Sequence, residues 1–196
     1  APTVENAHPH SCNCGKVAVV HNGIIENYKE LRAKLEAKGC TFRSQTDTET
    51  VAHLVATKYG ETHDLTEAVR LATKEIEGAY ALCVIHQDVP NTIVATRRNA
   101  PLVVGLGEGE NFVASDIPAI INYTRDTYIL SDGELAIVTR DNVSVFDREG
   151  NPVDKEVFHV NWNAEAAEKG GYEHFMLKEI HDQPKAVRDT FGTHIS

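Results

Sequence analysis

The part of the chain that follows Gly78 consists of short apolar runs separated by turn residues, and this pattern restricts the fold more than any other feature. The runs cover residues 79–87, 91–98, 100–107 and 111–116, and residues 128–153 continue the pattern. Further turns are indicated at Asp132-Gly133, Asp141-Asn142 and Glu149-Gly150. Because such short connections join antiparallel strands, the sequence predicts an antiparallel meander, interrupted by a short helix around residues 117–123.

The first part of the chain combines one strand with three helices. Residues 17–25, VAVVHNGII, are β-branched and predict a buried strand that runs into a turn at Asn22-Gly23. Helices are expected from Asn27, from the capping box at residues 46–49 and from Asp64, because each start offers an N-cap residue followed by an acidic one. Residues 40–45, CTFRSQ, are expected to form a short strand.

Helices and strands do not alternate along the chain as a parallel βαβ sheet would require. An α+β class with antiparallel sheets is therefore expected. Residues 155–171 are polar and broken, which predicts a linker. The tail from Tyr172 has a helical period until Pro184 interrupts it.

Charge and composition argue against two classes of partner. The net charge is -10, the pI is about 5.4, and no cluster of Lys and Arg offers a surface for nucleic acid or an anionic membrane. No apolar run approaches the roughly 18 residues of a membrane span, and the start lacks the features of a signal peptide. Four unevenly spaced cysteines suit a reducing compartment, so a cytoplasmic protein that binds a small polar metabolite or another protein is expected.

His8, His10, Cys12 and Cys14 alternate within seven residues and raise the question of a metal site. Zinc sites usually space paired cysteines by two to four residues, so one Cys-x-Cys pair without a second pair fits poorly. A reactive thiol would need a lowered pKa, for which Lys16 alone is weak support. The alternative is a polar loop with a few buried contacts.

The run VVHNGIIEN contains the strongest chemical signal. An Asn-Gly pair can direct a side-chain amide and a backbone N–H into a cleft, where both would stabilise a developing oxyanion. Asn-Gly is also the commonest hairpin turn, so the residues alone leave the two readings open.

Six segments resemble the glutaminase half of the isomerising glutamine–fructose-6-phosphate aminotransferases, a family of class II glutamine amidotransferases. They are NAHPH (6–10), HNGIIENYKELR (21–32), SQTDTETVAHLV (44–55), EGAYAL (77–82), APLVVGLGEGENFVASD (100–116) and KEIHDQP (178–184). The resemblance covers essentially the whole chain, in order. It implies the four-layer αββα sandwich of the N-terminal nucleophile hydrolases, here incomplete.

The resemblance assigns three site residues. The oxyanion hole falls to the Asn22 side chain and the Gly23 main-chain N–H, and recognition of the glutamine α-amino group falls to Asp47. Asp47 can also serve as a helix cap, since a carboxylate at a helix start can keep one oxygen free. No metal or organic cofactor is implied.

The resemblance also implies features that these residues do not contain. The family's nucleophile is an N-terminal cysteine, whereas position 1 here is Ala, and an Arg-Trp-Ala-Thr-His-Gly segment that helps to hold glutamine has no counterpart. We therefore expect part of a longer protein, with a glutaminase domain over residues 1–154, a linker over 155–171 and the start of a sugar isomerase domain over 172–196.

The expected function is to supply ammonia from L-glutamine to the isomerase domain of the same polypeptide, which makes glucosamine 6-phosphate. A homo-oligomer is expected for the full-length enzyme. The alternatives are another class II amidotransferase, such as amidophosphoribosyltransferase, or a non-catalytic binding domain that keeps the oxyanion pocket.

Overall fold

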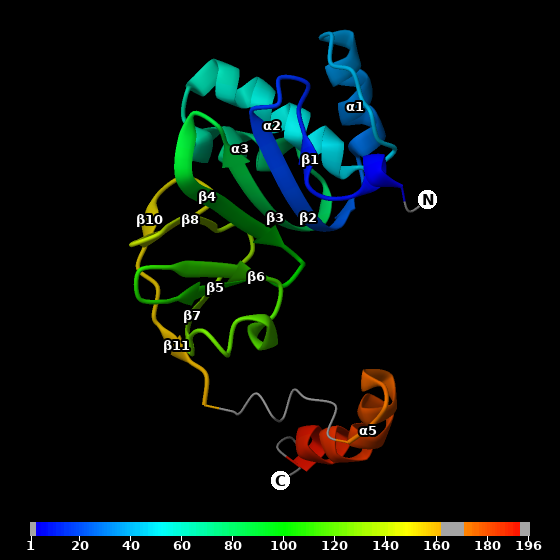
Figure 1. Cartoon of the computed structure of the whole chain (residues 1–196), viewed down its shortest axis with the longest axis vertical. Helices are drawn as coiled ribbons and strands as arrows, with labels where there is room; N and C mark the ends of the chain where they lie inside the picture. Colours follow the sequence, from blue (N-terminus) through cyan, green and yellow to red (C-terminus); the bar gives the residue numbers. More distant parts are fainter. Residues whose placement is uncertain (1–2, 162–170, 193–196) are drawn as a thin grey trace. The chain divides into compact units, whose positions relative to one another are not determined.

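The computed structural model describes residues 3–161 and 171–192, which fall into two compact units, Ala1–Val160 and Asn161–Ser196 (Figure 1). In the first unit the helices are η1 (Val4–Asn6), α1 (Tyr28–Ala37), α2 (Thr48–Thr62), α3 (Leu65–Glu75) and η2 (Ile117–Ala119). Its strands are β1 (His10–Ser11), β2 (Val17–Ile25), β3 (Gly78–His86), β4 (Val89–Arg98), β5 (Val103–Leu106), β6 (Asn111–Ala114), β7 (Asp126–Ile129), β8 (Leu135–Thr139), β9 (Val143–Phe146), β10 (Pro152–Val153) and β11 (Phe158–His159).

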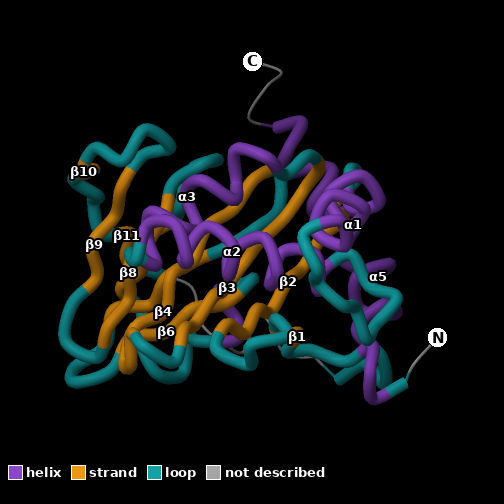
Figure 2. The backbone as a smooth tube through the Cα atoms, turned by 90° about the horizontal axis from the view of Figure 1, so that it is seen from above, coloured by secondary structure: helices purple, strands orange, loops and turns teal. Residues whose placement is uncertain are grey.

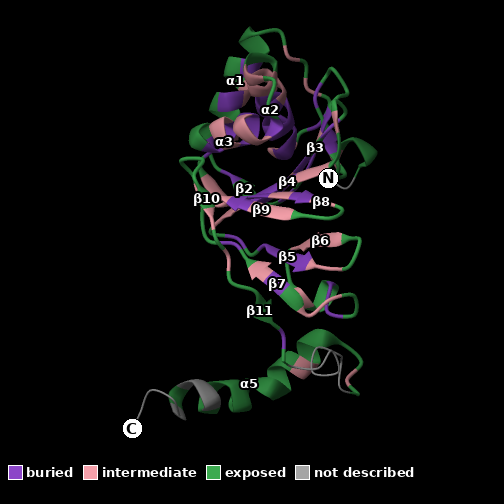
Figure 3. Cartoon of the chain, turned by 90° about the vertical axis from the view of Figure 1, so that its left-hand side faces the viewer, coloured by how far each residue is buried: buried purple, intermediate pink, exposed green. Residues whose placement is uncertain are grey.

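Within the described residues the strands form two sheets, and every strand pair is antiparallel. The large sheet has the order β1-β2-β3-β4-β8-β9-β10, and the small sheet has the order β11-β7-β5-β6. The three α-helices cover one face of the large sheet, and the small sheet packs against the other face (Figures 2 and 3). The α+β class with antiparallel sheets is therefore confirmed.

Two apolar cores hold these three layers together. Between the helices and the large sheet, Val17, Val19 and Ile25 of β2 pack with Val51 and Val55 of α2. Between the sheets, the core residues include Ala81, Ala95, Val104, Leu130 and Val138. The outer face of the small sheet is covered where Ile120 and Thr124, just after η2, lie against Gly105. Each Å² of apolar surface that these side chains bury contributes about 25 cal/mol to the free energy of folding, which makes burial the main stabilising contribution in both cores.

The strand expected at residues 40–45 is wrong, because this segment is a loop. The N–H of Cys40 donates to the Leu35 carbonyl, and several of the later N–H groups donate to side chains. The N–H of Thr41 donates to Asn13, and the N–H groups of Arg43 and Ser44 donate to the carboxylate of Glu49. The sequence has strand propensity here, but among the described residues this segment pairs with no strand.

Helix α1 begins after Asn27, as expected, and α2 begins after Asp47, one residue later than a capping box at residues 46–49 implies. Neither Asn27 nor Asp47 caps its own helix with a side-chain bond. Asn27 instead bonds to the Glu75 carbonyl and to the Glu77 N–H, which ties the end of β2 to the end of α3. The expected cap at Asp64 does form, since its carboxylate accepts from the N–H of Glu67 at 3.0 Å.

The first unit extends a few residues beyond the glutaminase boundary expected at residue 154. Residues 158–159, expected in the linker, form β11 and pair with β7, and Val160 is fully buried. Residues 162–170 of that linker lie outside the described residues.

The second unit contains helix α5 (Phe175–Gly192), which runs through Pro184 instead of ending there. Large apolar side chains along it are exposed, among them Met176, Ile180 and Val187. No helix in the described part of the chain is both long and apolar enough to cross a membrane.

Candidate active site

Strand β2 carries two of the three expected site residues in its second half. Its residues alternate between the two faces of the large sheet. Val17, Val19 and Ile25 face the helices, whereas Val20 and Asn22 line a hollow on the side of the small sheet. The side chain of Asn22 is therefore presented away from the helical core.

The turn expected at Asn22-Gly23 is wrong, because β2 continues through both residues to Ile25 and pairs with β3 without a bulge. Gly23 lies opposite Tyr80 with φ at +135°, a conformation that side chains disfavour. A Cβ at this position would also overlap the carbonyl oxygen of Ala79 and lie 2.9 Å from the Cα of Tyr80. Only glycine allows β2 and β3 to approach this closely.

One edge of β2 has no neighbouring strand beyond Val19, within the part of the chain that the structure describes, because β1 pairs only with Ala18 and Val19. Asp47 lies at this edge, and its Oδ2 accepts from the N–H of Ile25 at 2.7 Å. N–H directions alternate along a strand, so the N–H of Gly23 faces the same edge. The structure thus brings Asp47 to the strand that carries Asn22 and Gly23.

Asn22 borders two hollows in the surface. The first has a volume of about 420 Å³ and lies between β2, β3 and the small sheet, with Val20, Cys83 and Ser115 among its lining residues. The second has a volume of about 350 Å³ and is lined by Gly23, Glu26 and Asn99, among others. A small polar ligand in the second hollow can therefore contact both Asn22 and Gly23, whereas Asp47 lines neither hollow.

A larger hollow of about 640 Å³ opens farther along the same sheet, near Lys16, Ile85 and Arg140. None of the three expected site residues lines it. Volume alone would make this hollow the candidate ligand site. The polar groups of Asn22 and Gly23 instead favour the hollows beside β2.

A histidine–threonine cluster lies beside the candidate site at the start of α2. The Oγ1 of Thr48 is 3.0 Å from Nδ1 of His21 and 3.2 Å from Nε2 of His8. His21 is buried, and its Nε2 has no hydrogen-bond partner among the described residues. Burial lowers the pKa of His21, although nearby Asp47 opposes this shift, and the ring is therefore neutral at pH 7.

The sequence did not predict the contacts of Thr48 with His8 and His21. One signal was available for His21. It directly precedes Asn22 on β2, so its side chain is directed to the opposite face of the sheet, where Thr48 lies. His10 is held separately, with its Nε2 3.1 Å from the Oγ1 of Thr46.

Glu49 fixes the loop that precedes α2. Its buried carboxylate accepts from the N–H of Arg43 at 2.8 Å, from the N–H of Ser44 at 2.7 Å and from the Ser44 hydroxyl at 2.6 Å. Burial raises the pKa of Glu49, but these hydrogen bonds outweigh burial and hold it below the ordinary value. A fixed loop in turn holds Asp47 at the edge of β2.

Cys12 and Cys14 form a disulfide, so neither is a free thiol or a ready metal ligand. Across the described ranges 3–161 and 171–192, no group of three or more His, Cys, Asp or Glu side chains is arranged to hold a metal ion.

A family model for the glutamine amidotransferase domain matches residues 3–122. Among curated relatives, the isomerising glutamine–fructose-6-phosphate aminotransferases of Clostridium tetani and Clostridium perfringens are 53% and 56% identical over 194 residues. Each match covers 99% of this chain and 32% of the relative, so the chain spans about a third of their length.

Solved structures agree with the fold. The glutamine phosphoribosylpyrophosphate amidotransferase from B. subtilis has a TM-score of 0.62 and 25% identity, covering 76% of this chain and 33% of that one. A second structure, described as the allosteric regulatory enzyme of purine biosynthesis, has the same TM-score of 0.62 at 22% identity. These neighbours have the N-terminal nucleophile hydrolase type of fold that the resemblance implies.

The family match covers more than half of the chain, and the resemblance seen in the sequence motifs points the same way. The chain belongs to the glutamine amidotransferase domain family.

Proposed function

We propose that this chain is the glutamine-binding part of an enzyme that transfers the amide nitrogen of L-glutamine to fructose 6-phosphate, giving glucosamine 6-phosphate. The observation that carries the proposal is that Asn22 and Gly23 lie next to each other on β2 and that Asp47 bonds to the same strand, at the N–H of Ile25. The identity with relatives that are named for this reaction supports the choice of acceptor.

Asn22 and Gly23 would act on the amide oxygen of glutamine. When a nucleophile attacks the amide carbon, this oxygen gains negative charge, and two fixed N–H donors stabilise the charge without reorganising. The strand conformation of β2 fixes the Gly23 donor, because Gly23 packs closely against Ala79 and Tyr80 of β3. The nucleophile itself is not assigned to any of these residues.

Asp47 would bind the α-amino group of glutamine. One of its oxygens is used by the N–H of Ile25, and the other remains to accept from an ammonium group. A charge-assisted hydrogen bond of this kind orients the substrate so that its amide reaches Asn22.

The rest of the reaction belongs to the longer protein. Residues from about 172 onward would begin the isomerase domain that receives the ammonia, joined to the glutaminase part through the chain up to residue 171. We further propose a homo-oligomer that works in the cytoplasm.

The test supplies amide-labelled glutamine and fructose 6-phosphate to the longer polypeptide that contains this chain, and follows the label by mass spectrometry. The expected product is labelled glucosamine 6-phosphate. Label in phosphoribosylamine, after supply of phosphoribosyl pyrophosphate, would support another class II amidotransferase instead. Binding of glutamine without release of glutamate would support a non-catalytic domain.

A further inference from the structure

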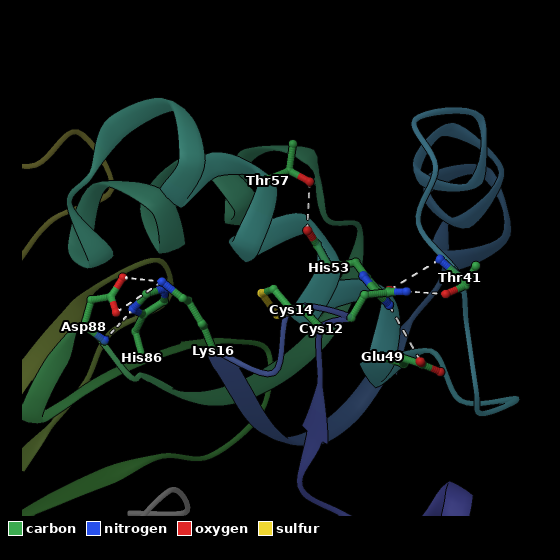
Figure 4. Close-up of a disulfide and its surroundings, with 10 residues drawn as sticks. Cys12, Cys14, Lys16, Thr41, Glu49, His53, Thr57, His86 and Asp88 are labelled. Atoms are coloured by element: carbon green, nitrogen blue, oxygen red, sulfur yellow. Dashed lines mark hydrogen bonds and ion pairs between the residues drawn. A yellow bond between two sulfur atoms is a disulfide. The ribbon is translucent and has the colours of Figure 1, made fainter.

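A disulfide joins Cys12 and Cys14 in the turn between β1 and β2 (Figure 4). The two Cα atoms are 5.4 Å apart, within the range that a disulfide requires. Only Asn13 separates the two cysteines in the sequence. Neither the proposed glutamine chemistry nor the three residues assigned to it uses this pair.

The two sulfur-bearing residues differ in exposure. Cys12 is 5% exposed and belongs to the core between the helices and the large sheet, whereas Cys14 is exposed. A thiolate that approaches from solvent therefore reaches Cys14 more readily than Cys12. In such an attack the buried sulfur is the leaving group.

The disulfide contributes little to the stability of the fold. A disulfide constrains the unfolded chain less as the loop that it closes becomes shorter, and this loop is very short. The turn is also held without it, because the N–H of Gly15 donates to the Cys12 carbonyl at 2.9 Å and the N–H of Cys12 donates to the Val17 carbonyl at 3.3 Å. Asn13 and Thr41 add a side-chain contact to the loop before α2. The fold of the turn is therefore compatible with both the disulfide and the dithiol.

We propose that Cys12 and Cys14 form a reversible thiol–disulfide exchange site, with Cys14 as the sulfur that external thiolates attack. In reduction, a partner thiolate bonds to the Cys14 sulfur, and the Cys12–Cys14 bond breaks to release the Cys12 thiolate, which takes a proton. A second partner thiolate then attacks the partner's sulfur in the mixed disulfide and releases Cys14. Two electrons pass from the partner, which leaves as a disulfide.

The other two cysteines do not compete for this role. Burial raises the pKa of Cys40, and burial raises the pKa of Cys83 to about 11, so both remain thiols at neutral pH. Lys16, the nearest cation in sequence, pairs with Asp88 at 3.1 Å, and Figure 4 shows its side chain directed there. Lys16 is therefore engaged by Asp88 and is not a neighbouring cation of the kind that lowers the pKa of a catalytic cysteine. The pair is suited to reversible oxidation and not to nucleophilic catalysis.

The first experiment equilibrates the folded chain with glutathione at graded ratios of the reduced and oxidised forms, quenches with acid and counts free thiols with a maleimide in denaturant. The oxidised chain should show two thiols and the reduced chain four, since the sequence has four cysteines and two are free in the structure. The variants Cys40→Ser and Cys83→Ser should keep the two-thiol change, and Cys14→Ser should lose it. Four thiols at every ratio, or two thiols until the chain unfolds, would overturn the proposal.

The second experiment identifies the attacked sulfur. In Cys12→Ala, the remaining Cys14 should form a mixed disulfide with glutathione, whereas in Cys14→Ala the buried Cys12 should react at least about tenfold more slowly. Circular dichroism confirms that each variant is folded. Faster reaction at Cys12 would contradict the assigned direction.

The third experiment compares two sources of thiolate. Reduced glutathione and a protein with a Cys-x-x-Cys dithiol are supplied separately to the oxidised chain. Reduction by either one supports the exchange site and identifies its source of electrons. Failure of both to reduce the folded chain rules the site out.

Discussion

The carboxylate of Asp47 accepts a hydrogen bond from the backbone N–H of Ile25 at 2.7 Å, and this contact joins the start of α2 to the end of β2. The contact is two residues from Gly23, on the strand edge that the Gly23 N–H faces. A residue proposed to bind substrate therefore also holds the strand that carries the oxyanion donors. Substitutions of Asp47 can therefore remove its negative charge while keeping its hydrogen bond to Ile25.

Replacing Asp47 by Asn keeps an oxygen for the Ile25 N–H but removes the negative charge. In the longer enzyme we expect the KM for glutamine to rise roughly 10- to 100-fold, because a hydrogen bond to a charged group contributes about 1.5–3 kcal/mol. Steady-state release of glutamate measures this effect. Asp64→Asn is the matched control, since Asp64 caps α3 away from the site and should leave KM unchanged. A fall in kcat with an unchanged KM would contradict the binding role.

Replacing Asn22 by Ala removes one donor to the developing oxyanion. In the longer enzyme kcat should fall by roughly 10²–10³ with little change in KM, as expected for a donor used mainly in the transition state. The exposed Asn122 offers a control, and Asn122→Ala should keep both constants. If Asn22→Ala instead raised KM alone, Asn22 would be a ground-state contact and not an oxyanion donor.

Local sequence patterns predicted the positions of most helices and strands, but not why particular residues occur in them. The β-branched run predicted β2 correctly, yet the Asn22-Gly23 pair suggested a turn because glycine with positive φ is typical of turns. Here glycine is needed for a different reason, the close approach of β3 at Ala79. A glycine can be required by a turn or by a closely packed neighbouring strand. Here the neighbouring strand decides, and it lies more than 50 residues away in the sequence.

The same limit applies to polar side chains at helix starts. The sequence of residues 46–49 fits a capping box, but Asp47 bonds to Ile25 and Glu49 bonds to the loop before the helix. Asp64 caps its helix as expected, because its first contacts are local. The bond from Ile25 to Asp47 spans 22 residues and depends on the tertiary fold, so no local pattern predicts it.

The candidate site was located by its resemblance to a family, and the structure adds its surroundings. Asn22, Gly23 and Asp47 came from the motifs, and their roles remain proposals. The contacts of Thr48 with His8 and His21 were not predicted, because they depend on the packing of α2 against β1 and β2. No periodicity in the sequence encodes that contact.

Gly23→Ala should destabilise the first unit strongly. The added methyl group meets the Ala79 carbonyl, and φ at +135° is unfavourable for any side chain, so a loss on the order of 3 kcal/mol is expected. Urea denaturation of the folded chain measures it. Gly60→Ala is the matched control, because Gly60 lies inside α2 with no atom near its added Cβ, and it should gain about 0.5–1 kcal/mol. Equal stability of the two variants would contradict the close approach.

The stability of the chain should fall as the pH drops below about 6.5, the ordinary pKa of histidine. Burial lowers the pKa of His21 in the folded state, so the unfolded chain binds more protons between the folded and the ordinary pKa. Folding stability therefore rises with pH across that window and is lost as the pH falls through the folded pKa. Protonation would place a charge on a buried Nε2 that has no described partner.

Urea midpoints measured from pH 7.5 to 5 check this prediction. His21→Asn should flatten the dependence on pH, although its overall stability can also change. His63→Asn is the control, because His63 is exposed and in a left-handed conformation that Asn tolerates, and its slope should match the original chain. His10, His53 and His86 contribute in the same direction, since burial lowers their pKa values too, so part of the slope should remain in His21→Asn.

Residues 1–196 on their own should not hydrolyse glutamine. In the oxidised chain Cys12 and Cys14 are joined in a disulfide, and burial raises the pKa values of Cys40 and Cys83, so none of the four cysteines supplies a thiolate at pH 7. In the reduced chain an internal cysteine still lacks the free α-amino group that the family's nucleophile uses. An oxyanion hole without a nucleophile leaves only residual catalysis. The measurement is glutamate release from glutamine by the oxidised and the reduced chain, with Cys83→Ser as a further comparison, because Cys83 borders the hollow that contains Asn22. Glutamate release at the rate of a full-length relative, lost in Cys83→Ser, would show instead that Cys83 is a nucleophile and that the burial argument is wrong.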